Sequence, residues 1–148
     1  MYTAIFSMSV PALHRLEQIW RKIDKFGIFV GDKEHIVFMK EYLSKQEQPN
    51  DIYEVNNDDQ LAKIDLNILK NPCTIFVLST EFITSSLWKM IDQIGKRGRY
   101  QPPHSDKDIK TNDDLKIGVF LTTDSYEKTR SLYRRDPRHF AIYQIHEE

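Results

Sequence analysis

One short run of the chain is apolar almost throughout: CTIFVL, residues 73–78, where only Thr74 is polar. A second run, KIGVFL at residues 116–121, has the same character after its opening lysine. Branched and aromatic side chains dominate both runs, which is typical of parallel strands buried on both faces of a sheet. We therefore predict that these two runs are central strands of a sheet that helices cover on both sides.

Strand and helix patterns alternate along the rest of the chain. Further strands are predicted at residues 3–8, 26–30, 52–55 and 140–143. This alternation favours a three-layer, flavodoxin-like α/β sandwich, in which a mostly parallel sheet of five or six strands has helices on both faces. In an alternative assignment, residues 26–30 form the first strand and residues 1–25 are an extension.

Two of the connecting segments carry predictions of their own. Residues 58–69 are predicted to form one helix, capped by Asp58 or Asp59. Residues 96–115 are polar and contain the pair Pro102-Pro103, without an apolar face that could dock on a core. We predict that this segment is a mobile loop.

Length and composition indicate one ordinary globular domain over residues 1–148. Hydrophobic residues make up 40% of the chain and charged residues 29%. The formal net charge is -1, so the chain as a whole has no field that would attract nucleic acid or an anionic membrane. We therefore expect neither a nucleic acid nor a membrane as its partner.

The cysteine usage and the first residues point to a reducing cytoplasm. Cys73 is the only cysteine, so no intrachain disulfide can form, and its apolar surroundings predict a small buried hydrophobe. The chain starts without a basic segment followed by a long apolar one, and no apolar run is long enough to span a bilayer. The expected location is cytoplasmic.

The chemistry of such a sheet is expected where its strands end. Ligands of open α/β sheets bind outside the carboxyl ends of the strands, where the strand order reverses. The polar residues that follow the apolar runs are Ser7, Ser9, Gly31, Asp32, residues 79–82 and residues 122–125. The sequence has no GxGxxG, GxxxxGK[ST] or GxSxG motif, and its five histidines lack metal-ligand spacing, so we predict no metal site and no bound cofactor.

The most specific pattern lies within residues 64–92. A helix with paired aliphatic residues precedes the buried strand, and Ser79, Phe82, Ser85 and Trp88 follow it. This pattern resembles the TIR (Toll/interleukin-1 receptor) domain family, although Trp88 comes one residue late relative to Ser85. A generic strand–helix unit with a capped helix and a core tryptophan would show the same residues.

The resemblance implies an NAD+ site. Catalytic TIR domains cleave NAD+ at the nicotinamide–ribose bond with a glutamate four residues after the tryptophan, and Asp92 holds that position here. Its carboxylate would stabilise positive charge on the ribose. An aspartate is one methylene shorter, and a displacement of about 1 Å costs on the order of a hundredfold in rate. Asp92 is therefore either a weaker catalytic group or a solvated helix residue, and the sequence leaves both open.

The resemblance also implies partners and a lining for the site. The partners would be NAD+ or a related nucleotide as substrate, and either further copies of the chain or other TIR-like domains. The expected binding residues are Ser7, Ser9, Ser79, Phe82 and Trp88. The implied activity is that of an NAD+ glycohydrolase or cyclase in signalling or defence.

Two other kinds of protein share this architecture. Residues 28–36 resemble the first strand and acidic turn of a receiver domain, but the buried strand ends in Ser79 instead of a phosphorylatable aspartate, and no lysine follows Ile142. A receiver-like or adaptor domain would then act by protein–protein interaction, without phosphorylation. A nucleotide-binding or base-exchange enzyme is the third reading, in which basic residues such as Arg97 and Arg99 contact phosphates.

Overall fold

The computed structural model describes residues 10–23, 25–46, 51–79, 85–102, 105–133 and 141–144. Its main sheet has five parallel strands in the order β2-β3-β6-β1-β7, with bounds β1 (Phe26–Gly31), β2 (Asp51–Glu54), β3 (Cys73–Ser79), β6 (Lys116–Thr122) and β7 (Ala141–Gln144). The helices are α1 (Val10–Lys22), α2 (Lys33–Gln46), α3 (Asp58–Ala62), the 3-10 helix η2 (Leu66–Lys70), α4 (Ser85–Arg97) and α5 (Thr123–Tyr133). A short antiparallel hairpin joins β4 (Arg99–Tyr100) to β5 (Ile109–Lys110).

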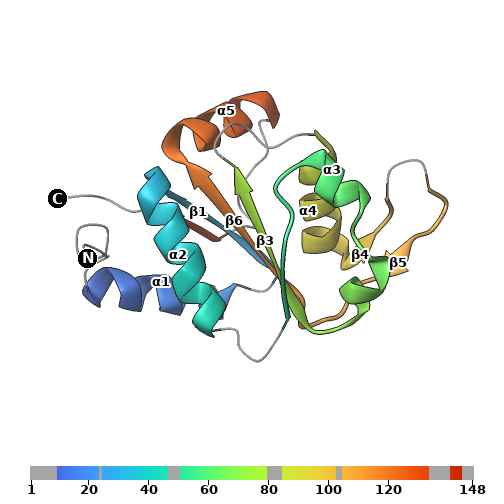
Figure 1. Cartoon of the computed structure of the whole chain (residues 1–148), viewed down its shortest axis with the longest axis horizontal. Coiled ribbons are helices and arrows are strands. Elements are labelled where there is room, and N and C mark those ends of the chain that lie inside the picture. The colour runs from blue at the N-terminus through green and yellow to red at the C-terminus, as the bar shows by residue number, and fades with distance from the viewer. Residues whose placement is uncertain are drawn as a thin grey trace.

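Helices cover both faces of this sheet. In Figure 1, α1 and α2 lie on one side of the strands, whereas α3, α4 and the β4–β5 hairpin lie on the other. The predicted three-layer sandwich with a mostly parallel sheet is confirmed. The connection from β1 to β2 runs along the sheet in one direction, and all later connections between its strands run in the other direction. Because parallel strands are joined by right-handed crossovers, α2 lies on one face of the sheet, and α3, α4 and α5 lie on the other face. The first strand lies between the fourth and the fifth, whereas flavodoxin has it between the second and the third.

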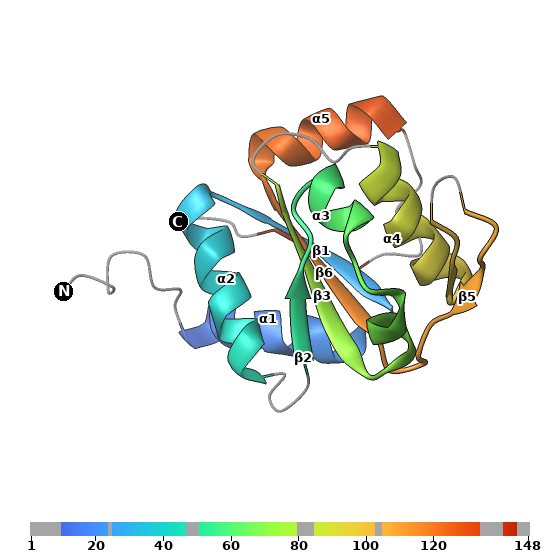
Figure 2. The same cartoon turned by 45° about the vertical axis from the view of Figure 1, so that its right-hand side comes forward.

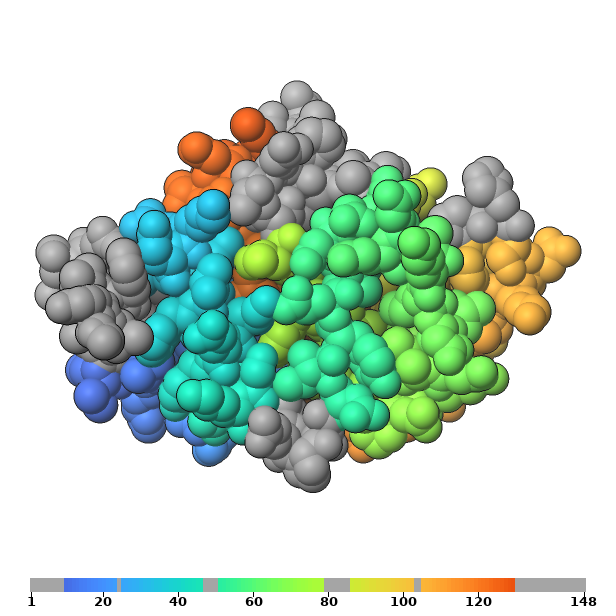
Figure 3. Space-filling model, viewed as in Figure 1, coloured from blue at the N-terminus to red at the C-terminus, as the bar shows by residue number. Residues whose placement is uncertain are grey.

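The two apolar runs are interior strands, as predicted. β6 lies in the middle of the sheet and β3 is its neighbour, with Ile75 opposite Ile117 and Val77 opposite Val119. These side chains contribute to the core beneath α3 and α4, while alternate residues of the same strands face α1 and α2. Figure 2 shows the strands side by side, and in the view of Figure 3 α2 and the segment from β2 to η2 hide most of the sheet.

The predicted single helix over residues 58–69 is wrong. Helix α3 ends at Ala62, and η2 begins at Leu66 after a short break. The Asp65 side chain accepts a hydrogen bond from the backbone N–H of Asn67, which starts a separate turn. Helix α3 is capped by Asn57, whose side chain accepts from the N–H of Gln60, and not by either aspartate that follows it.

The prediction that residues 96–115 have nothing to dock is also wrong for the residues described. Helix α4 continues to Arg97, and Gly98, with a φ of 62°, turns the chain into the hairpin. Tyr100 is only 2% exposed and belongs to the core, so this polar segment has an aromatic anchor. The strand predicted at residues 3–8 lies outside the described residues. No helix among those residues is long and apolar enough to cross a membrane.

Gly95 offers a test of how α4 packs. A Cβ atom at this position would overlap the ring of the buried Phe26 at the start of β1. We expect Gly95→Ala to lower the urea midpoint, because overpacking costs about 1–3 kcal/mol. That cost opposes the roughly 1 kcal/mol that alanine normally gains over a helical glycine.

The matched background for this test is Phe26→Leu, which removes the ring. There the Gly95→Ala change should be neutral or stabilising, so the two changes form a double-mutant cycle with a large interaction energy. Equal destabilisation in both backgrounds would show that the ring is not the obstacle.

Candidate functional site

The strand order creates one switch point at the carboxyl edge of the sheet. All five strands are parallel, so their carboxyl ends share that edge. The chain leaves β1 toward α2 on one face and leaves neighbouring β6 toward α5 on the other. Ligands of open α/β sheets bind outside the strand ends at such a point, and we use the word crevice for the position between the ends of β1 and β6. Gly31 and Asp32 meet residues 122–125 there, as predicted from the sequence, because Gly31 is paired with Thr122.

The β1 side of the crevice has an unusually short connection. Strand β1 ends at Gly31 and α2 begins at Lys33, which leaves Asp32 alone between them. The Asp32 carbonyl accepts the first hydrogen bond of the helix, from Ile36 N at 2.9 Å. Its carboxylate is 60% exposed and lies 3.7 Å from Nδ1 of His35, an ion pair when the histidine is protonated. A single residue cannot fold into a phosphate-cradling loop, and this one carries a negative charge.

On the β6 side of the crevice, the hydroxyl group of Thr122 is used within the protein. Thr122 Oγ1 accepts a hydrogen bond from Ser125 N at 3.2 Å, which caps the first turn of α5. Ser125 itself is fully buried, and Asp124 is exposed in the same turn. The helix start is therefore already occupied by a threonine cap and an acidic side chain, which oppose binding of an anion there.

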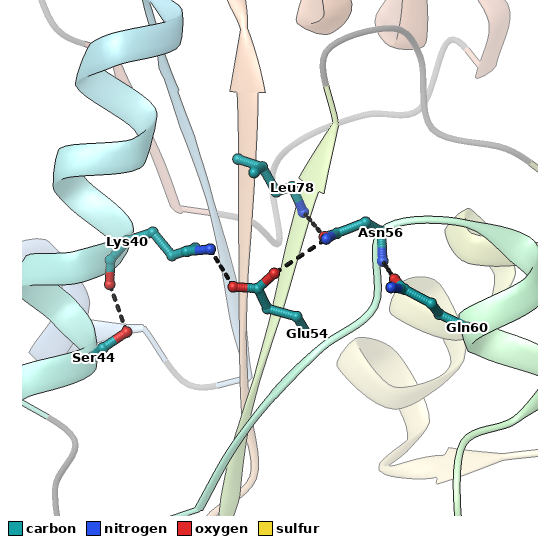
Figure 4. Close-up of polar contacts among 6 residues, drawn as sticks. All are labelled: Lys40, Ser44, Glu54, Asn56, Gln60 and Leu78. Carbon is teal, nitrogen blue, oxygen red and sulfur yellow. Dashed lines mark hydrogen bonds and ion pairs between the residues drawn. The ribbon is translucent and has the colours of Figure 1, made fainter.

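A network of polar side chains ties the end of β2 to its neighbours (Figure 4). Asn56 Oδ1 accepts from Leu78 N of β3 at 2.9 Å, so a side chain continues the pairing between the two strands. Asn56 Nδ2 donates to Glu54 Oε2 at 3.1 Å, and Glu54 Oε1 pairs with Lys40 Nζ of α2. Gln60 of α3 accepts from Asn56 N at 2.6 Å. The network links both faces of the sheet at an edge strand, and its groups are satisfied by one another.

The side chains predicted to bind or cleave NAD+ are only partly described. Ser7, Ser9 and Phe82 lie outside the described residues, and Ser79 is described only in its backbone, as the last residue of β3. Trp88 is 5% exposed and packs in the core, which confirms that it anchors α4 against the sheet.

Asp92 lies on the flank of α4. It is seven residues after the helix start, about 10 Å along the axis, and its carboxylate is 3.2 Å from Lys96 Nζ. The side chain of Asp92 is 19% exposed, so it is neither fully solvated nor sealed in the core. The contact to Lys96 is an i,i+4 pair that stabilises the helix whatever else the carboxylate does. A catalytic role for Asp92 stays a prediction.

Neither a metal centre nor a reactive cysteine is found among the residues that the structure describes. No group of three or more metal-ligating side chains is close enough there to hold an ion. Burial, with a contribution from nearby Asp51, raises the pKa of the Cys73 thiol to about 11. Cys73 is 2% exposed, so it is the small buried hydrophobe that its surroundings predicted.

The Asn56 network predicts a loss of stability on truncation. Asn56→Ala leaves the Leu78 N–H without its acceptor and removes the bond to Glu54, which should cost about 1–3 kcal/mol in the unfolding free energy. The matched control is Asn67→Ala, an exposed asparagine on η2 that should change stability by less than about 0.5 kcal/mol. Chemical denaturation measures both, and equal effects would refute a special role for Asn56.

The same network predicts a dependence on pH. Burial raises the pKa of Glu54, but the hydrogen bonds from Lys40 and Asn56 and the charge of Lys40 outweigh it, so this pKa lies below its usual 4.5. The group therefore adds stability above its usual pKa, and this stability is lost as the pH falls through the lowered value. Between about pH 7 and about pH 3 the wild type should lose more stability than Lys40→Met. Equal losses would contradict the pairing.

Comparison with known proteins bears on the fold. No protein-family model matches the chain, and no curated protein matches it. Two solved structures with a similar fold are those of NtrX from Brucella abortus, one in complex with ADP and the other with ATP. Each is 13% identical with a TM-score of 0.56, and they cover 94% and 95% of this chain. The chain spans about a third of the length of NtrX, since the match covers 36% of it.

Proposed function

We propose that this chain is a non-catalytic, cytoplasmic α/β domain that acts by protein–protein interaction, as a receiver-like or adaptor module would. The observation that carries the proposal is the single-residue connection between β1 and α2 at the switch point. A nucleotide-binding site needs a loop there whose N–H groups surround phosphate. This chain instead places Asp32 in that position and Asp124 across the crevice.

The described part of the crevice has neither a glycine-rich phosphate loop nor a basic side chain other than Lys33, which is exposed. A diphosphate placed between Asp32 and Asp124 would meet two negative charges. The same repulsion applies to the diphosphate of NAD+.

The TIR-like reading is the second candidate, and Asp92 favours it. A carboxylate that is 19% exposed can still be reached from outside the protein. In that reading the chain would cleave NAD+ when a neighbouring copy completes the site, and Lys96 would hold the carboxylate in place between turnovers.

NAD+ turnover by purified, concentrated protein separates the two candidates. The interaction domain should give no nicotinamide above the buffer rate, and isothermal titration with ADP, ATP and NAD+ should give no heat of binding. The measurement is repeated under conditions that promote self-association, so that a site shared between copies would be detected.

The variants Asp92→Ala and Asp92→Glu serve as controls for this assay. If Asp92 is a short catalytic carboxylate, alanine abolishes turnover and glutamate preserves or raises it. Turnover that follows this pattern would overturn the proposal in favour of the TIR-like enzyme. Turnover in the wild type that neither variant changes would also overturn it, and would place the chemistry elsewhere.

A further inference from the structure

A groove of about 830 Å³ lies between α4 and the β4–β5 hairpin. One wall is a stripe along α4 made of Ser86, Lys89 and Gln93, which are three and four positions apart and so share a helix face. The opposite wall belongs to the hairpin and includes Gln101 and Asp106. This α4–hairpin groove is distinct from the crevice between β1 and β6.

The groove carries one charge of each sign. Lys89 and Asp106 are exposed, and neither makes a hydrogen bond or an ion pair with any residue that the structure describes. The adjacent hairpin charges behave differently, because Arg99 Nε pairs with Asp108 at 3.2 Å. The two walls therefore present an ammonium and a carboxylate to whatever lies between them.

The hairpin wall is held against α4 before any ligand arrives. Gln93 Oε1 accepts from Gln101 N at 2.8 Å, and Gln101 Nε2 donates to the Ser105 carbonyl at 2.8 Å. Tyr100, the residue before Gln101, is buried in the core. A ligand would find the groove already formed, so little binding energy would be spent on ordering it.

The dimensions of the groove suit an extended peptide. From Ser86 to Gln93 the helix advances about 10 Å, which matches about three residues of extended chain. Its volume is at the upper end for small-molecule sites, but its lining is mainly polar, whereas such sites are mostly apolar. Polar walls with opposite charges match a peptide backbone that carries charged side chains.

We propose that the α4–hairpin groove binds an extended segment of a partner protein, with an acidic side chain at Lys89 and a basic side chain at Asp106. This inference rests on the proposed function and names the surface through which it acts. Charge complementarity selects a segment with one acidic and one basic side chain, because a segment with two like charges would place one of them against its own sign.

Fluorescence polarisation with defined peptides tests the groove. The probes are fluorescein-labelled Glu-Ala-Thr-Lys, whose charged side chains point to opposite sides of an extended chain, and a neutral version with glutamine at both ends. We expect the charged probe to bind roughly tenfold more tightly than the neutral probe. Lys89→Glu and Asp106→Lys should each remove this preference, and the double variant, which exchanges the two charges, should restore it.

Lys110→Glu is the matched control, because Lys110 is an exposed hairpin residue that does not line the groove. It should leave the binding of each probe unchanged. Absence of binding, equal binding by the charged and the neutral probe, or displacement by equimolar free glutamate and lysine would overturn the inference. If the peptides fail while the chain also shows no NAD+ turnover, the proposed function stands and only this surface is wrong.

Discussion

The sheet depends on three aromatic rings from adjacent strands that pack beneath one tryptophan. Phe29, Phe120 and Phe76 lie on the same face, with ring centroids 5.3 Å apart for Phe29 and Phe120 and 5.1 Å for Phe76 and Phe120. Trp20 of α1 covers them, and this is feasible because Gly118 opposite Phe76 has no side chain. A Cβ atom there would be 3.1 Å from both Phe76 and Trp20. This packing fixes β3, β6 and β1 side by side, and so determines which loops meet at the carboxyl edge.

Local sequence predicted the parts of the fold that are set by burial on both faces. The apolar runs that form β3 and β6 could be identified as strands without knowing which strands they pair with, because almost every side chain in them is apolar and buried. The hairpin could not be predicted in this way. Its anchor, Tyr100, is a lone aromatic residue in a polar segment, and its burial depends on residues far away in the sequence. The break between α3 and η2 was missed because the spacing of apolar residues continues through it, while the Asp65 turn interrupts the backbone.

In the candidate site, too, some features could be predicted from local sequence, whereas others depend on residues that are far apart in the chain. The general rule for parallel sheets located Gly31, Asp32 and residues 122–125 at one edge, because strand ends can be read from the sequence. What these side chains contact could not be read from it. Thr122 caps α5, and the end of β2 is held by Asn56, whose pairing with Leu78 joins residues 22 positions apart. The walls of the α4–hairpin groove likewise come together only after the hairpin has folded back on α4.

The burial of Tyr100 makes the hairpin part of the cooperative unit and not an appendage. The hairpin cannot leave α4 without exposing part of the core beneath α3 and α4, so its detachment carries a cost in free energy that loops without a buried anchor do not have. A molecule that bound the hairpin against α4 would therefore stabilise the entire chain, by an amount that grows with the logarithm of its concentration above the dissociation constant. Conversely, a substitution that destabilises the core would weaken the binding of a ligand in the α4–hairpin groove.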